Sequence, residues 1–163
     1  MATVELRFTP LPAHVRTARL LAAVLARRAG VDESLIDEVK LAVGEACARA
    51  VGLHQQHAPA DDVVVEIRDD GGAFEIVVTD RGPHDADTAV AATGAAVADP
   101  PDLFDADELA GPSSEVGRAL PPGFGLAVVA GLVDDLAVTS AETGTVVRMT
   151  WSPDAAAPPA EAD

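Results

Sequence analysis

Residues 37–50 have the sequence DEVKLAVGEACARA, and this stretch decides the fold that we expect. Between residues 35 and 50 the apolar side chains recur at helical spacing, so one face of a helix would pack on a core. Acidic residues from residue 32 onward suit the positive end of the helix dipole. The stretch therefore predicts a helix over about residues 32–53, with Glu45 on it.

The segments on either side predict an α/β arrangement of strands and helices. Residues 3–9 alternate between apolar and polar side chains, which indicates a half-buried strand, and residues 12–29 have the apolar spacing of another helix. After a polar connector at residues 54–62, two alternating strands flank residues 69–72 (DDGG), which are a hairpin signal. Two more strands are expected near the end of the domain, at residues 135–141 and 145–151.

The stretch over residues 83–122 breaks this periodicity. It contains six prolines and many acidic residues, and Arg118 is its only lysine or arginine. A long insertion of this kind in a compact domain is usually a functional lid or a disordered loop. Residues 152–163 consist mostly of proline, alanine and acid, which predicts a disordered acidic tail after one domain over residues 1–151.

The composition excludes several classes of partner. A formal net charge of −16 repels phosphates and anionic lipid, so direct binding to nucleic acid or membrane is not expected. General solubility of an acidic protein explains the charge equally well. No apolar run is long enough to span a bilayer, and the first residues lack the pattern of a signal peptide. With the single cysteine Cys47, the chain is expected in the reducing cytoplasm.

Asp80 stands at the end of an apolar row. Alternation along the second hairpin strand places it on the same face as Phe74, Ile76 and Val78. A carboxylate on a core-facing row is costly unless a partner binds it, and it can accept a hydrogen bond from an exocyclic amine such as that of adenine. Capping of a turn explains Asp80 taken alone equally well.

Three glycines and a threonine add to this candidate site. Gly82 would let a base approach the backbone, while Gly123 and Gly125 at the start of a helix would expose amide hydrogens to phosphate. Thr145 shares a strand face with Val147 and Met149, so its hydroxyl can point where Asp80 points. A glycine pair before a helix is, by itself, more often ordinary loop chemistry.

Four motifs in this order resemble one known family. Residues 37–47 resemble the N-box helix of the anti-sigma-factor serine kinases, which belong to the histidine-kinase-like ATPase superfamily with its Bergerat fold. Residues 80–83 (DRGP) resemble the first glycine box of this family, residues 123–129 (GFGLAVV) the second, and residues 144–147 (GTVV) the closing strand. The resemblance covers roughly residues 10–150.

This resemblance implies a two-layer α/β (α+β) sandwich in which helices cover one face of a mixed β-sheet, with residues 83–122 as a lid loop. It implies an adenine pocket for ATP or ADP between the sheet and the helices, with Glu45 as the candidate general base. Members of the family bind a sigma factor or a small STAS-type anti-anti-sigma protein, and some phosphorylate a serine on the latter. The nucleotide-binding residues that it implies are Asp80, Gly82, Gly123, Gly125, Leu126 and Thr145.

The chain departs from the family at two positions. The family places a magnesium-holding asparagine four residues after the N-box glutamate, but here that position is Arg49, whose guanidinium cannot bind a cation. Arg49 would contact the nucleotide phosphates, lock Glu45 in an ion pair, or form a solvent-facing pair without functional effect. His84 replaces the second glycine of the first box, and Arg118 is the only cation of the acidic lid that can contact phosphate. These changes argue against a magnesium site.

The departures favour a binding module, that is, an anti-sigma-factor-like regulator that captures a sigma factor or an anti-anti-sigma protein with little or no phosphotransfer. An active ATP-dependent serine kinase is the alternative, and a nucleotide or small-molecule sensor is a third hypothesis. A homodimer is compatible with each of them. No metal site is predicted, because His54 and His57 lack a second pair of ligands and are expected to be solvent-exposed near a helix end.

Overall fold

The computed structural model describes residues 2–82, 124–141 and 143–152. The predicted lid, and the predicted tail beyond residue 152, therefore lie outside the described residues. The elements in chain order are β1 (Ala2–Phe8), α1 (Pro12–Ala29), the 3-10 turn η1 (Glu33–Leu35), α2 (Ile36–His57), β2 (Val63–Asp69), β3 (Phe74–Asp80), α4 (Phe124–Ala130), β4 (Asp135–Ala141) and β5 (Gly144–Trp151).

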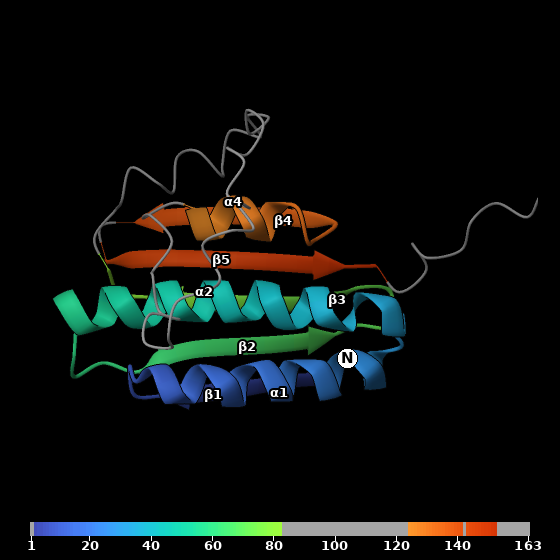
Figure 1. Ribbon diagram of the computed structural model, residues 1–163, viewed down its shortest axis with the longest axis horizontal. Coiled ribbons are helices and arrows are strands. Elements are labelled where there is room, and N and C mark those ends of the chain that lie inside the picture. Colours follow the sequence, from blue (N-terminus) through green and yellow to red (C-terminus); the bar gives the residue numbers. More distant parts are fainter. Residues whose placement is uncertain (1, 83–123, 142, 153–163) are drawn as a thin grey trace, which may run out of the picture.

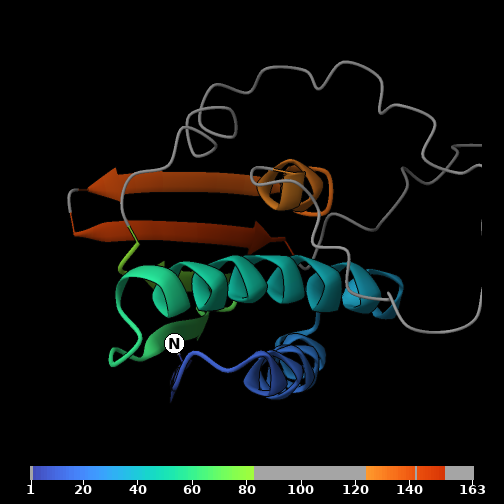
Figure 2. The same ribbon diagram turned by 60° about the vertical axis from the view of Figure 1, so that its left-hand side comes forward.

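The elements form the expected two-layer sandwich. The strands make one sheet in the order β1-β2-β3-β5-β4, and α1, α2 and α4 cover one of its faces, as Figure 1 shows with the helices in front of the strands. In the turned view of Figure 2, α1 and α2 lie side by side on that face. The prediction of an α+β sandwich with helices on one face is confirmed.

The prediction of a mixed sheet is wrong, because all four neighbouring strand pairs of the described sheet are antiparallel. Two helices connect β1 to β2, so the chain reverses direction three times between these strands and β2 runs antiparallel to β1. Two hairpins, β2–β3 and β4–β5, add antiparallel pairs, and β5 enters between β3 and β4. A single helix between neighbouring strands would have given a parallel pair.

The predicted central helix has different ends from those expected. It starts with the turn η1, where the Asp32 carboxylate accepts a hydrogen bond of 2.8 Å from the backbone N–H of Ser34. It then continues to His57, four residues beyond the predicted end. The connector that was expected from residue 54 is therefore partly helical. This extra turn places His54 against the sheet layer rather than in solvent.

The core lies between α2 and the sheet. Alanines on the inner face of α1 allow it to approach α2 closely, and a Cβ added to Gly44 of α2 would lie 3.1 Å from Cδ of Arg19. The fully buried residues of the sheet alternate along the strands, as the sequence predicted. They include Val63, Val65, Phe74, Ile76, Val78, Val147, Met149 and Trp151.

Cys47 should be unreactive in the folded protein. It is fully buried on α2, and burial raises the pKa of its thiol to about 12 from 9.0. At pH 8 the folded protein therefore holds about a thousandfold less thiolate than the unfolded chain, and thiolate is the reactive species. We expect negligible labelling by an aromatic disulfide reagent without denaturant and stoichiometric labelling in guanidinium chloride. Rapid labelling of the native protein would contradict this burial.

Gly144 should be required at the start of β5. Its φ is 146°, and a Cβ added there would lie 1.9 Å from the carbonyl oxygen of Asp80. Gly144→Ala adds backbone strain to a steric overlap, so we expect a loss of at least about 3 kcal/mol in the free energy of unfolding. Gly71→Ala is the matched control, because Gly71 has a φ of 84° but no atom within 4 Å of the added Cβ. The control should cost about 1–2 kcal/mol in urea denaturation, and equal losses would refute the close approach.

Candidate functional site

Asp80 is the last residue of β3 and faces the helices. Its side chain is 2% exposed, which is what the alternation along β3 predicts. Oδ1 accepts hydrogen bonds from the backbone N–H of Gly82 at 2.9 Å and from that of Thr145 at 3.3 Å. Thr145, the opposite residue on β5, is fully buried. The sheet thus brings Asp80 and Thr145 together from segments that are 65 residues apart.

Arg49 pairs with Asp80. Its Nη1 donates to Oδ2 of Asp80 at 2.6 Å, and the arginine side chain is 15% exposed. None of the three outcomes predicted for Arg49 included this pair, and among the ion pairs of the described residues Arg49 has no bridge to Glu45. Helix α2 lies over β3, so Arg49 reaches the buried carboxylate. Such a carboxylate needs a cation, since removing one partner of a buried pair costs about 3–5 kcal/mol.

Glu45 lies against the start of α4. A Cβ added to Gly125 would lie 3.3 Å from Oε2 of Glu45, so the N-box carboxylate and the second glycine box are in contact. Leu126, the next residue, is buried at 1% exposure and belongs to the core. Gly123 and Arg118, also predicted for the nucleotide site, lie outside the described residues, as does His84. The structure therefore places Glu45 beside Gly125, and Arg49 beside Asp80 and its neighbour Thr145. Glu45 and Arg49 are one turn apart in the middle of α2, so they connect the two contacts.

Gly82 packs on α2. A Cβ added there would lie 2.8 Å from Cβ of Leu53, which is closer than real side chains approach. Sequence analysis attributed this glycine to the approach of a base. The geometry supplies a second reason, namely the contact between the loop after β3 and the last turns of the helix.

His54 is a site residue that sequence analysis missed. It was predicted to be exposed, but it is fully buried, whereas His57 is exposed. Its Nε2 accepts a hydrogen bond of 2.9 Å from the backbone N–H of Arg81, and its Nδ1 lies 2.9 Å from the carbonyl oxygen of Asp61. The proton therefore resides on Nδ1, and the ring links three segments. The spacing of positions 47, 50, 51 and 54 continues the apolar face and could have revealed this burial.

The described residues do not fit magnesium or an adenine amine well. Arg49 occupies the position of the expected metal ligand and would repel a cation. Both oxygens of Asp80 already accept hydrogen bonds, and one of them accepts from Arg49. An incoming amine would have to displace or crowd that guanidinium.

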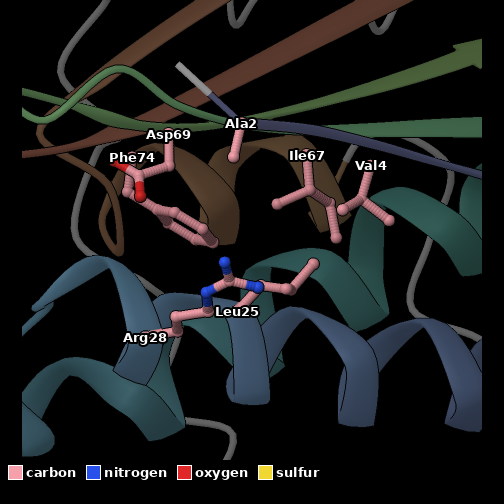
Figure 3. Close-up of a pocket in the computed structure, with 7 residues that line it drawn as sticks. All are labelled: Ala2, Val4, Leu25, Arg28, Ile67, Asp69 and Phe74. Carbon is pink, nitrogen blue, oxygen red and sulfur yellow. The ribbon is translucent and has the colours of Figure 1, made fainter.

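A small hollow lies at the opposite end of β3, where the strand begins. Figure 3 shows Leu25 and Arg28 reaching from α1 towards Phe74 and Ile67 of the sheet, and the hollow has a volume of about 30 Å³. That volume suits roughly one water molecule. It contains none of the candidate site residues. Separately, none of the described helices is long and apolar enough to cross a membrane.

The chain is similar in sequence to known proteins. Residues 8–151 match the family model described as the histidine kinase-like ATPase domain. The chain is 31% identical to the serine-protein kinase RsbW of Bacillus velezensis over 157 residues, which covers 90% of this chain and 83% of that protein. It is 28% identical to the serine-protein kinase RsbW of Oceanobacillus iheyensis over 156 residues, which covers 90% and 84%.

One solved structure is similar in fold. The crystal structure of RsbU and RsbW domains from Mycobacterium tuberculosis superposes with a TM-score of 0.60 at 18% identity, over 93% of this chain and 32% of that chain. At this identity the likeness concerns the fold alone. It agrees with the sandwich of Figure 1.

His54→Ala should destabilise the turn after β3. The variant empties a fully buried position and leaves the Arg81 N–H and the Asp61 carbonyl without their partner, at an expected total cost of about 1–3 kcal/mol. His57→Ala, three residues along the same helix but exposed, should stay within about 0.5 kcal/mol of the parent. Urea denaturation followed by circular dichroism measures both. Two equal, small effects would contradict the bridging role.

Proposed function

The chain belongs to the histidine kinase-like ATPase domain family, and on that premise we propose that it is a partner-switching regulator of transcription. It would bind a sigma factor or a STAS-type anti-anti-sigma protein, with ATP binding and phosphotransfer weakened or lost. The net charge of −16 supports a protein partner, because a chain this acidic is repelled by nucleic acid.

The ion pair between Arg49 and Asp80 carries the second half of this proposal. Phosphoryl transfer depends on positioning of the phosphates and on neutralisation of their charge by metal ions. Arg49 stands where a magnesium ligand is expected, and its guanidinium lies 2.6 Å from the carboxylate that would receive adenine. One side chain thus weakens both the metal site and the base site. The substitution at position 49 changes the pocket and not the outer surface of the domain, which is the surface that we propose for partner binding.

An active serine kinase is the second candidate, and one observation favours it. The Glu45 carboxylate adjoins Gly125 at the start of α4, where a general base would face a phosphate site. The relatives named above are also serine-protein kinases. If the chain is a kinase, the guanidinium of Arg49 replaces part of the positive charge that magnesium supplies in the family. Glu45 then accepts the proton of the attacking serine.

Partner capture without phosphotransfer is the expected result. The purified chain is mixed with STAS-domain proteins and sigma factors from the same genome, and complexes are resolved by size-exclusion chromatography and native mass spectrometry. We expect a stable complex with one of them in the absence of nucleotide, because the proposed role is capture of the partner and needs no phosphotransfer. Labelled ATP and magnesium should transfer no phosphate to the partner. If no complex forms with any of them, the regulatory role is wrong.

Two variants separate the candidates if transfer is seen. Glu45→Gln should abolish it in a kinase, whereas Gln56→Glu, at an exposed site on the same helix, should not. Arg49→Asn restores the expected metal ligand. If ATP binding has been weakened by Arg49, this variant should bind ATP more tightly. If the chain is a kinase that uses Arg49, the variant should lose activity.

A further inference from the structure

The row of polar side chains next to Arg49 indicates what the pocket can bind. Asp80 on β3, Thr145 on β5 and Ser140 on β4 are consecutive partners across the sheet, so their side chains share the face that the helices cover. Arg49 reaches this row from α2. The row therefore combines one ion pair with two hydroxyl groups at one end of the sheet.

Three polar atoms of this cluster have no hydrogen-bond partner among the described residues. They are Nη2 of Arg49, Oγ1 of Thr145 and Oγ of Ser140, and all three are buried. Thr145 as a whole is fully buried. Buried polar groups in native proteins are nearly always paired, so three unpaired atoms in one cluster point to a ligand or to ordered water. Arg49 is the member of the cluster that retains exposure, at 15%, so a ligand would approach the buried hydroxyls from its side.

An adenine amine is a hydrogen-bond donor and needs an acceptor, whereas Arg49 makes the cluster present donors. Asp80 alone would offer an acceptor, but Arg49 donates to it, and Nη2 adds a second donor beside it. A guanidinium has donors only, whereas a hydroxyl both donates and accepts. The ligand edge that fits has a carbonyl oxygen facing Arg49 and an adjacent N–H facing a hydroxyl.

We propose that Arg49, Thr145 and Ser140 bind the base edge of a 6-oxopurine nucleotide, of the guanine or hypoxanthine type, and that Arg49 sets the preference over adenine. O6 would accept from Nη2 of Arg49, and N1–H would donate to Thr145 or Ser140. Adenine places an amine, which is a donor, opposite the donor of Arg49, so this contact is mismatched, whereas a hydroxyl can adapt to its bare N1 by donating. In nucleic-acid recognition the same chemistry pairs arginine with guanine, and asparagine or glutamine with adenine.

This proposal rests on the family assignment of the pocket as a nucleotide site, and it is independent of partner capture. Partner capture is measured without nucleotide, so its failure would leave base preference standing. A wrong base preference would equally leave the partner complex intact. The two proposals can therefore fail separately.

The test compares inosine diphosphate with adenosine diphosphate by calorimetry on the full chain without magnesium. The two ligands share sugar and phosphates, so any difference in affinity reports on the purine. We expect the inosine nucleotide to bind at least about tenfold more tightly, and guanosine diphosphate to behave likewise. Equal affinities, a preference for adenosine diphosphate, or no binding of either ligand up to about 1 mM would overturn the proposal. If neither ligand binds, the three unpaired polar atoms bind ordered water only.

Variants assign the preference to its residue. Arg49→Gln removes the charge and should erase or reverse the ratio, while Arg49→Lys retains a cationic donor and should preserve its direction. Arg16→Gln, an exposed arginine of α1, is the matched control and should leave the ratio unchanged. If circular dichroism shows that Arg49→Gln is unfolded, the proposal is tested by the ratio of affinities in the wild-type chain and in Arg49→Lys. An unchanged ratio in folded Arg49→Gln would overturn the role of Arg49.

Discussion

The buried carboxylate of Asp80 is the constraint on which the rest of the site depends. A charged group at 2% exposure is stable only when its surroundings supply compensating partners, and here every neighbouring segment contributes one. Helix α2 supplies the Arg49 guanidinium, the loop after β3 supplies the Gly82 N–H, and β5 supplies the Thr145 N–H. Asp80 therefore joins the helix layer to the sheet at the end where the site is located.

The segment that follows Asp80 is fixed from its other side by uncharged contacts. His54 accepts from Arg81 N–H, Leu53 fills the space next to Gly82, and Gly144 passes against the Asp80 carbonyl. These contacts need a buried histidine and two positions without a side chain. Because they hold the backbone independently of the ion pair, the chemistry of Arg49 can change without moving Asp80. A substitution at position 49 that removes the charge thus costs stability through the unpaired carboxylate, while these contacts keep Asp80 in place in variants that fold.

Sequence reasoning found the parts of this site that depend on local periodicity. Alternation along β3 placed Asp80 inward, and helical spacing placed the buried face of α2 against the sheet. It failed where the partner is distant in sequence. Arg49 and Asp80 are 31 residues apart, so spacing along one helix suggested Glu45 as the partner of Arg49 instead. The direction of the strands likewise depends on how many helices separate them and on strand order, which periodicity does not contain.

The charges outside the ion pair point to the same conclusion about the ligand. Residues 83–123, between the two glycine boxes, contain eight acidic residues against the single cation Arg118. The net charge of −16 of the whole chain opposes polyphosphates through a field that salt screens only beyond about 10 Å. Recognition by uncharged donors and acceptors on a base is much less sensitive to that field. With Asp80 neutralised by Arg49, the base edge becomes the part of a nucleotide that this pocket is best equipped to distinguish.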